Sequence, residues 1–90
     1  MSRFQGAVRT ASPGMILGSF QGFWWGANFS TSEGTRRLPH GALVHIGEDI
    51  ATYELVHKGL RRIQTSSGKP QGGLVPLVNI SEDLQVISLP

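Results

Sequence analysis

The chain has 90 residues, contains no cysteine, and carries eight Lys and Arg residues against six Asp and Glu, a formal net charge of +2. This length fits one domain with a marginally sufficient core, and the missing cysteines exclude disulfides and thiolate metal sites. The near balance of charge excludes a polybasic nucleic-acid tail and an acidic solvating tail. Because association buries apolar surface that a small monomer leaves in water, we expect the protein to oligomerise.

Residues 1–14 are predicted to form an N-terminal arm, and residues 15–90 a single small β-rich domain. The arm is polar and ends in the turn sequence Ser12-Pro13-Gly14. The apolar stretch after it has wide aromatic rings where a signal peptide has a small-residue cleavage site, so we expect no secretory signal. The protein is therefore expected in the cytoplasm or within an assembled particle.

Glycines recur at every fourth position of the uncharged stretch that follows, namely Gly14, Gly18, Gly22 and Gly26. On a strand, residues two apart share a face, so these glycines would alternate with Ile16, Phe20 and Trp24. In a soluble helix they would cost about 4 kcal/mol relative to alanine, a large part of a typical domain stability. We expect a strand or strand pair over residues 15–29, with close-packing glycines and a bulge at Gly22 or Gly26.

The apolar part of this stretch is too short for a membrane helix. It covers residues 15–29 and is interrupted by Ser19, Gln21 and Asn28. A transmembrane helix needs roughly 20 predominantly apolar residues. Membrane association is therefore not expected.

Short apolar runs separated by turn residues fill the rest of the chain. They predict strands over residues 43–46, 50–56, 60–65, 74–80 and 84–89. Turns every 8 to 12 residues are typical of a small sandwich or barrel. Pro76 places its strand at a sheet edge or a bulge. The predicted fold class is mostly β, a small single-domain barrel or sandwich.

A helix around residues 48–58 is the alternative, and it would make the fold α+β. Apolar residues near this segment follow a helical spacing, and acidic residues at its start and basic residues at its end suit a helix dipole. The β-formers Thr52, Tyr53 and Val56, and the hairpin sequence Lys58-Gly59, favour strands instead.

The order of three landmarks in the second half resembles that in SH3 domains. The landmarks are Ala42-Leu43-Val44, then Lys58-Gly59 before Leu60, then Gly73-Leu74-Val75-Pro76 leading to Val78. The resemblance implies a small SH3-like barrel. It does not imply peptide binding, because the aromatic pair precedes these landmarks and the tyrosines of a proline-binding groove are missing.

Five of the seven aromatic residues lie within ten positions and form the predicted interface: Phe20, Phe23, Trp24, Trp25 and Phe29. Adjacent strand positions face opposite sides, so one of Trp24 and Trp25 would face outward. An outward aromatic ring is a typical interface anchor. Burial of both tryptophans by the arm or a loop is the alternative.

Basic residues supply an alternative site that would bind single-stranded nucleic acid together with the aromatic rings: Arg36, Arg37, Lys58, Arg61, Arg62 and Lys69. Acidic residues are interleaved with them, so they also fit an ordinary solvated surface.

The three histidines match no metal-ligand spacing. A hairpin over residues 43–56 would bring His45 near Glu54, but this pair lacks a nucleophile and an oxyanion hole. We expect no catalytic residue, no metal and no cofactor. The predicted function is a non-enzymatic structural module that associates with itself or a larger scaffold, such as a virion or phage-particle accessory subunit. The alternative is a small nucleic-acid-binding β-barrel.

Overall fold

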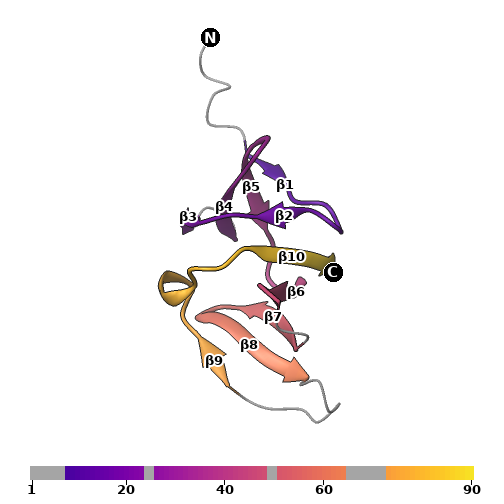
Figure 1. Cartoon of the computed structure of the whole chain (residues 1–90), viewed down its shortest axis with the longest axis vertical. Coiled ribbons are helices and arrows are strands. Elements are labelled where there is room, and N and C mark those ends of the chain that lie inside the picture. Colours follow the sequence, from indigo (N-terminus) through magenta and orange to yellow (C-terminus); the bar gives the residue numbers. More distant parts are fainter. Residues whose placement is uncertain (1–7, 24–25, 49–50, 65–72) are drawn as a thin grey trace.

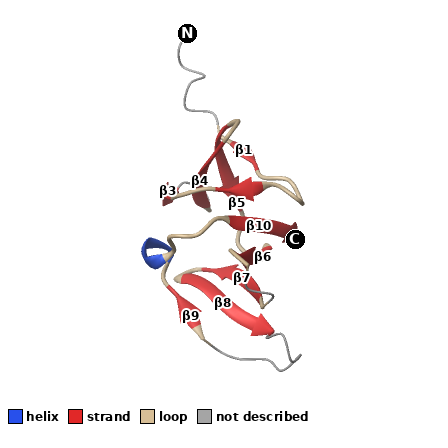
Figure 2. Cartoon of the chain, viewed as in Figure 1, coloured by secondary structure: helices blue, strands red, loops and turns tan. Residues whose placement is uncertain are grey.

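The computed structural model describes residues 8–23, 26–48, 51–64 and 73–90, which form two β-sheets (Figures 1 and 2). Sheet A has the strand order β1-β5-β4-β3, and sheet B has the order β2-β10-β6-β7-β8-β9. The described ranges contain no α-helix, and their single helical turn is the 3-10 helix η2 (Leu77–Asn79). The prediction of a small, mostly β fold is confirmed.

Sheet B has four longer strands at its centre, β10 (Leu84–Ser88), β6 (Leu43–Ile46), β7 (Thr52–Val56) and β8 (Gly59–Gln64). Its two outer strands are β2 (Ile16–Leu17) and β9 (Leu74–Val75). The predicted strand over residues 74–80 is shorter, because it ends before Pro76 and continues as η2. β9 lies at the edge of the sheet, as Pro76 predicted.

The helical alternative for residues 48–58 is wrong where the structure describes this segment. β7 and β8 form a hairpin in which Val56 pairs with Gly59. Tyr53 and Leu55 are buried, whereas their neighbours along β7 are only half-buried. This alternation lets one face of the strand enter the core, and β-branched residues fit such a surface.

Sheet A is built from β1 (Arg9–Thr10), β3 (Phe20–Phe23), β4 (Ala27–Thr31) and β5 (Gly34–Leu38). The expected strand or strand pair over residues 15–29 is thus β2, β3 and the start of β4. β1 lies within the predicted arm and pairs in parallel with β5.

The chain passes from sheet B to sheet A at Gly18 and Ser19. Gly18 N donates to Ser30 O at 2.6 Å, and Ser30 N donates to Ser19 O at 2.9 Å. A Cβ atom on Gly18 would stand 2.7 Å from Ser30 Oγ and 3.1 Å from Ser30 O. The bend therefore depends on a residue without a side chain. In Figure 1, β2 and β10 lie side by side where the two sheets meet.

One buried apolar cluster joins the two sheets. Its largest members include Phe29, Leu17 and Leu38 together with Leu55 and Leu60. No helix within the described ranges has the length and apolar content to cross a bilayer.

Candidate functional site

Three phenylalanines form a line of rings that leads from the core to the surface. Phe29 is 1% exposed, Phe20 is half-buried against the core, and Phe23 is 63% exposed. The ring centres of Phe29 and Phe20 are 5.7 Å apart, and those of Phe20 and Phe23 are 4.9 Å apart, both edge to face. These contacts hold the exposed Phe23 ring in place.

A bulge in β3 creates this line. Phe20 pairs with Phe29 and Phe23 pairs with Ala27, with a register shift between Phe20 and Gly22. Residues three apart on a regular strand face opposite sides, whereas an extra residue in the ladder brings them to the same side. The bulge lies beside Gly22, and the strict alternation of glycines with large residues does not continue through it.

β3 is also the longest edge strand. It ends sheet A and has no described strand on its outer side. Its four residues, Phe20–Phe23, contain no charge and no proline. The other edge strands, β1, β2 and β9, are each two residues long. Charges and prolines are common protections of a sheet edge, and β3 has neither, although its bulge between Phe20 and Gly22 is another such feature.

Phe23 borders a surface hollow of about 320 Å³ whose described lining residues are Phe23, Gly26, His40 and His57. We call this space the Phe23 hollow. A Cβ atom on Gly26 would stand 2.7 Å from Leu38 O, and Gly26 has a φ of +133°. A glycine is therefore required where β4 begins beside the hollow.

The two histidines of the Phe23 hollow come from different loops. His40 follows β5, and His57 lies in the turn between β7 and β8. Gly41 N donates to Leu55 O at 2.8 Å, and Leu55 N donates to Ala42 O at 2.9 Å. These bonds extend the pairing of β6 with β7 and hold the two loops together. The imidazole centres are 6.1 Å apart, with an interplanar angle of 62°.

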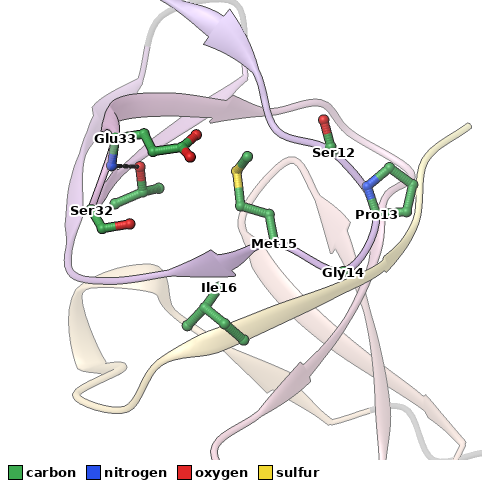
Figure 3. A pocket seen from close by; sticks show the side chains of 8 residues that line it. Ser12, Pro13, Gly14, Met15, Ile16, Ser32 and Glu33 are labelled. Atoms are coloured by element: carbon green, nitrogen blue, oxygen red, sulfur yellow. Dashed lines mark hydrogen bonds between the residues drawn. The ribbon is translucent and has the colours of Figure 1, made fainter.

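A second hollow, of about 340 Å³, lies between the turn before β2 and the turn between β4 and β5 (Figure 3). Figure 3 shows the Met15 side chain projecting between the two turns and Ile16 pointing away. Glu33 N donates to Thr31 Oγ1 at 3.0 Å and fixes the second turn. The described residues that line this second hollow are Ser12, Pro13, Gly14, Met15, Ile16, Thr31, Ser32 and Glu33.

The predicted aromatic interface is divided between the core and the surface. Phe29 is a core residue, and Phe23 is the exposed member. Trp24 and Trp25 lie outside the described residues.

The predicted close-packing glycines have different surroundings. Gly18 and Gly26 have backbone oxygens close to the position of a Cβ atom, whereas Gly14 and Gly22 have no described atom within 4 Å of it. Gly14 lies in a turn with a φ of +87°. Crowding therefore explains Gly18 and Gly26, and the described residues give no such reason for Gly14 or Gly22.

The arginines are divided between the two sheets. Arg36 Nη2 donates to Glu33 Oε1 at 3.1 Å, and Arg37 Nη2 donates to Thr10 Oγ1 at 3.1 Å. On β8, Arg61 Nη2 donates to Glu54 Oε1 at 3.0 Å.

Adjacent members of each pair, Arg36 with Arg37 and Arg61 with Arg62, face opposite sides of their strand. Lys58 is exposed in the β7–β8 turn, and Lys69 lies outside the described residues. The described residues thus do not gather the arginines on one sheet.

The register makes His45 a diagonal neighbour of Glu54 on the same face of β6 and β7, not its direct partner. Glu54 pairs with Leu43 across the strands, and its carboxylate accepts from Arg61. The sequence reasoning missed the pairing of His40 with His57. The hairpin turn after Val56 was the available signal, because it placed His57 at one end of the β6–β7 pair. No group of three or more potential metal ligands occurs among the described residues.

Comparison of the chain with protein-family models, with curated proteins and with solved structures finds no match in any of the three. Because no match indicates a function, the features that bear on function are β3 and the Phe23 hollow.

Proposed function

We propose that the protein is a non-enzymatic interaction module that self-associates, or docks on a larger protein assembly, through the edge of β3. The observation that carries this proposal is the exposure of Phe23, 63%, at the end of an uncharged edge strand. Exposed aromatic side chains beside a hollow are typical anchors of protein interfaces.

The Phe23 ring supplies the apolar part of the contact. Burying a phenylalanine side chain contributes about 1.5 to 3 kcal/mol. The edge-to-face contact with Phe20, at 4.9 Å, already fixes the ring. Less side-chain entropy is then lost when the ring is buried, which lowers one of the costs of association.

The backbone of β3 supplies the directional part of the contact, its main-chain hydrogen bonds. An edge strand presents N–H and C=O groups to an added strand, and main-chain hydrogen bonds give such additions their affinity. A second copy of β3 can pair with the first in antiparallel orientation, which produces a closed two-fold dimer. Self-association is therefore the form of the proposal that we test first.

The nucleic-acid alternative has less support. Arg36 and Arg61 already pair with Glu33 and Glu54. A backbone-binding surface needs basic groups gathered along one groove, and these two arginines lie on different sheets.

Light scattering coupled to size exclusion, from micromolar to near-millimolar protein, tests the proposal. We expect the mass of the wild-type protein to rise above that of the monomer as the protein concentration increases. Phe23→Ser and Gln21→Lys should both return it to the monomer, because one removes the anchor and the other adds a charge to the edge.

Val78→Ser is the matched control. Val78 is 77% exposed but lies on η2, beyond the edge strand of sheet B. A monomeric wild type at every concentration, or equal losses in the Phe23 and Val78 variants, would contradict self-association through β3.

A further inference from the structure

His40 and His57 are close enough to share one metal ion. Both are exposed and line the Phe23 hollow. At the tetrahedral angle of zinc, two zinc–nitrogen bonds of about 2.0 to 2.1 Å place the ring centres of their imidazoles roughly 5.2 Å apart. The observed separation of 6.1 Å is about 1 Å wider, so the two exposed side chains must approach each other by this amount to share an ion.

We propose that His40 and His57 form a two-histidine site for a divalent transition-metal ion such as Zn²⁺ or Ni²⁺. Imidazole is a preferred ligand of these ions and of Cu²⁺, whereas Mg²⁺ and Ca²⁺ prefer oxygen. The site therefore distinguishes transition metals from the alkaline-earth ions. It goes beyond the proposed function, since metal binding does not require association.

Both imidazoles are available for ligation. Their only described interaction is the contact between the two rings, and neither forms a hydrogen bond or ion pair with another described residue. The hollow, of about 320 Å³, has room for an ion and its waters, since a water takes up about 30 Å³ of liquid. Two protein ligands leave the remaining coordination positions to water or to an incoming ligand.

His45 provides an internal comparison. It lies on β6, paired with Gln85 of β10, and does not line the Phe23 hollow. It has no histidine beside it among the described residues. Metal ligation by the pair should therefore depend on His40 and His57 and be independent of His45.

Calorimetric titration of the untagged chain with Zn²⁺, and separately with Ni²⁺, tests the site near neutral pH. We expect saturable binding that weakens at least tenfold in His40→Ala and in His57→Ala and is unchanged in His45→Ala. Mg²⁺ should not bind.

Nuclear magnetic resonance identifies the ligands independently of the variants. Substoichiometric Ni²⁺ should broaden the ring resonances of His40 and His57 more than those of His45. Thermal melts of the alanine variants confirm that each remains folded. Phe23→Ala should keep metal binding even where it abolishes association, so failure of one proposal is distinguishable from failure of the other.

Two results would overturn the metal site. One is wild-type affinity in either the His40 or the His57 variant. The other is broadening of all three histidines to the same extent, which is expected of unspecific contact with the ion.

Discussion

The two sheets use their residues differently. In sheet B, β6, β7 and β10 alternate between buried and more exposed positions. In sheet A, three successive residues of β4 are buried, and β5 has half-buried Thr35, Arg36 and Arg37 between its ends. Sheet B thus has one face toward the core, whereas both faces of β4 are covered.

This difference in burial indicates which strands stabilise the domain and which are available for interaction with a partner. The centre of sheet B contributes apolar residues to the core, and its outward positions combine polar residues such as His45 and Glu54 with the half-buried Leu43 and Val56. Sheet A carries the aromatic line that ends at Phe23 and the polar Asn28, which is only 9% exposed. We infer that sheet B stabilises the domain, whereas sheet A has two roles: its inner strand β4 stabilises the domain through Phe29, and its edge strand β3 presents the binding surface through Phe23.

Replacement of the aromatic residues tests this division with the largest expected effect. Phe29→Ala should lower the free energy of unfolding by about 3 to 5 kcal/mol, because it leaves a cavity in the core. Phe23→Ala should cost less than about 1 kcal/mol in a monomer, because that ring is already exposed. Denaturant titration below the association concentration measures both. Equal losses would mean that Phe23 is a structural residue.

Glycine substitutions test the packing of sheet A at its edge. Gly26→Ala should cost about 1 to 3 kcal/mol, because its Cβ atom would meet Leu38 O and its φ is positive. Gly22 also has a positive φ, of +159°, but no described atom lies within 4 Å of its Cβ position, so Gly22→Ala should cost less. Thermal unfolding of the two variants compares them. A larger loss for Gly22 would show that crowding does not distinguish these positions.

Replacement of Asn28 should raise the stability of the domain, whereas the substitutions above lower it. The Asn28 Oδ1 atom is buried and has no hydrogen-bond partner among the described residues, which is costly in an apolar environment. Asn28→Leu keeps a similar shape and removes the unsatisfied atom, so it should raise the free energy of unfolding by about 1 kcal/mol. A loss of stability in chemical denaturation would show that Asn28 has a structural role in sheet A.

Sequence patterns predicted sheet B better than sheet A. The run Leu43–Ile46 is a strand with the predicted bounds, because it is a short, mostly apolar run flanked by turn residues. The stretch over residues 15–29 was predicted as a strand or strand pair with a bulge at Gly22 or Gly26, and the register shift lies beside Gly22. Its division into three strands depends on contacts with Ser30, which are tertiary features.

The candidate site was predicted in part. Clustering of aromatic residues pointed to Phe23, but local pattern could not distinguish it from the buried Phe29. That distinction requires the pairing of β3 with β4. The pairing of His40 with His57 similarly requires the register of β6 with β7, because 16 residues separate them in sequence.

Amide hydrogen exchange at low and high protein concentration tests the central proposal most directly. If β3 is the association edge, those of its amides that do not bond to β4 should become protected as concentration rises, whereas exchange in β9, the edge of sheet B, should not change. Unchanged exchange in β3 under conditions where the mass doubles would contradict association through this strand.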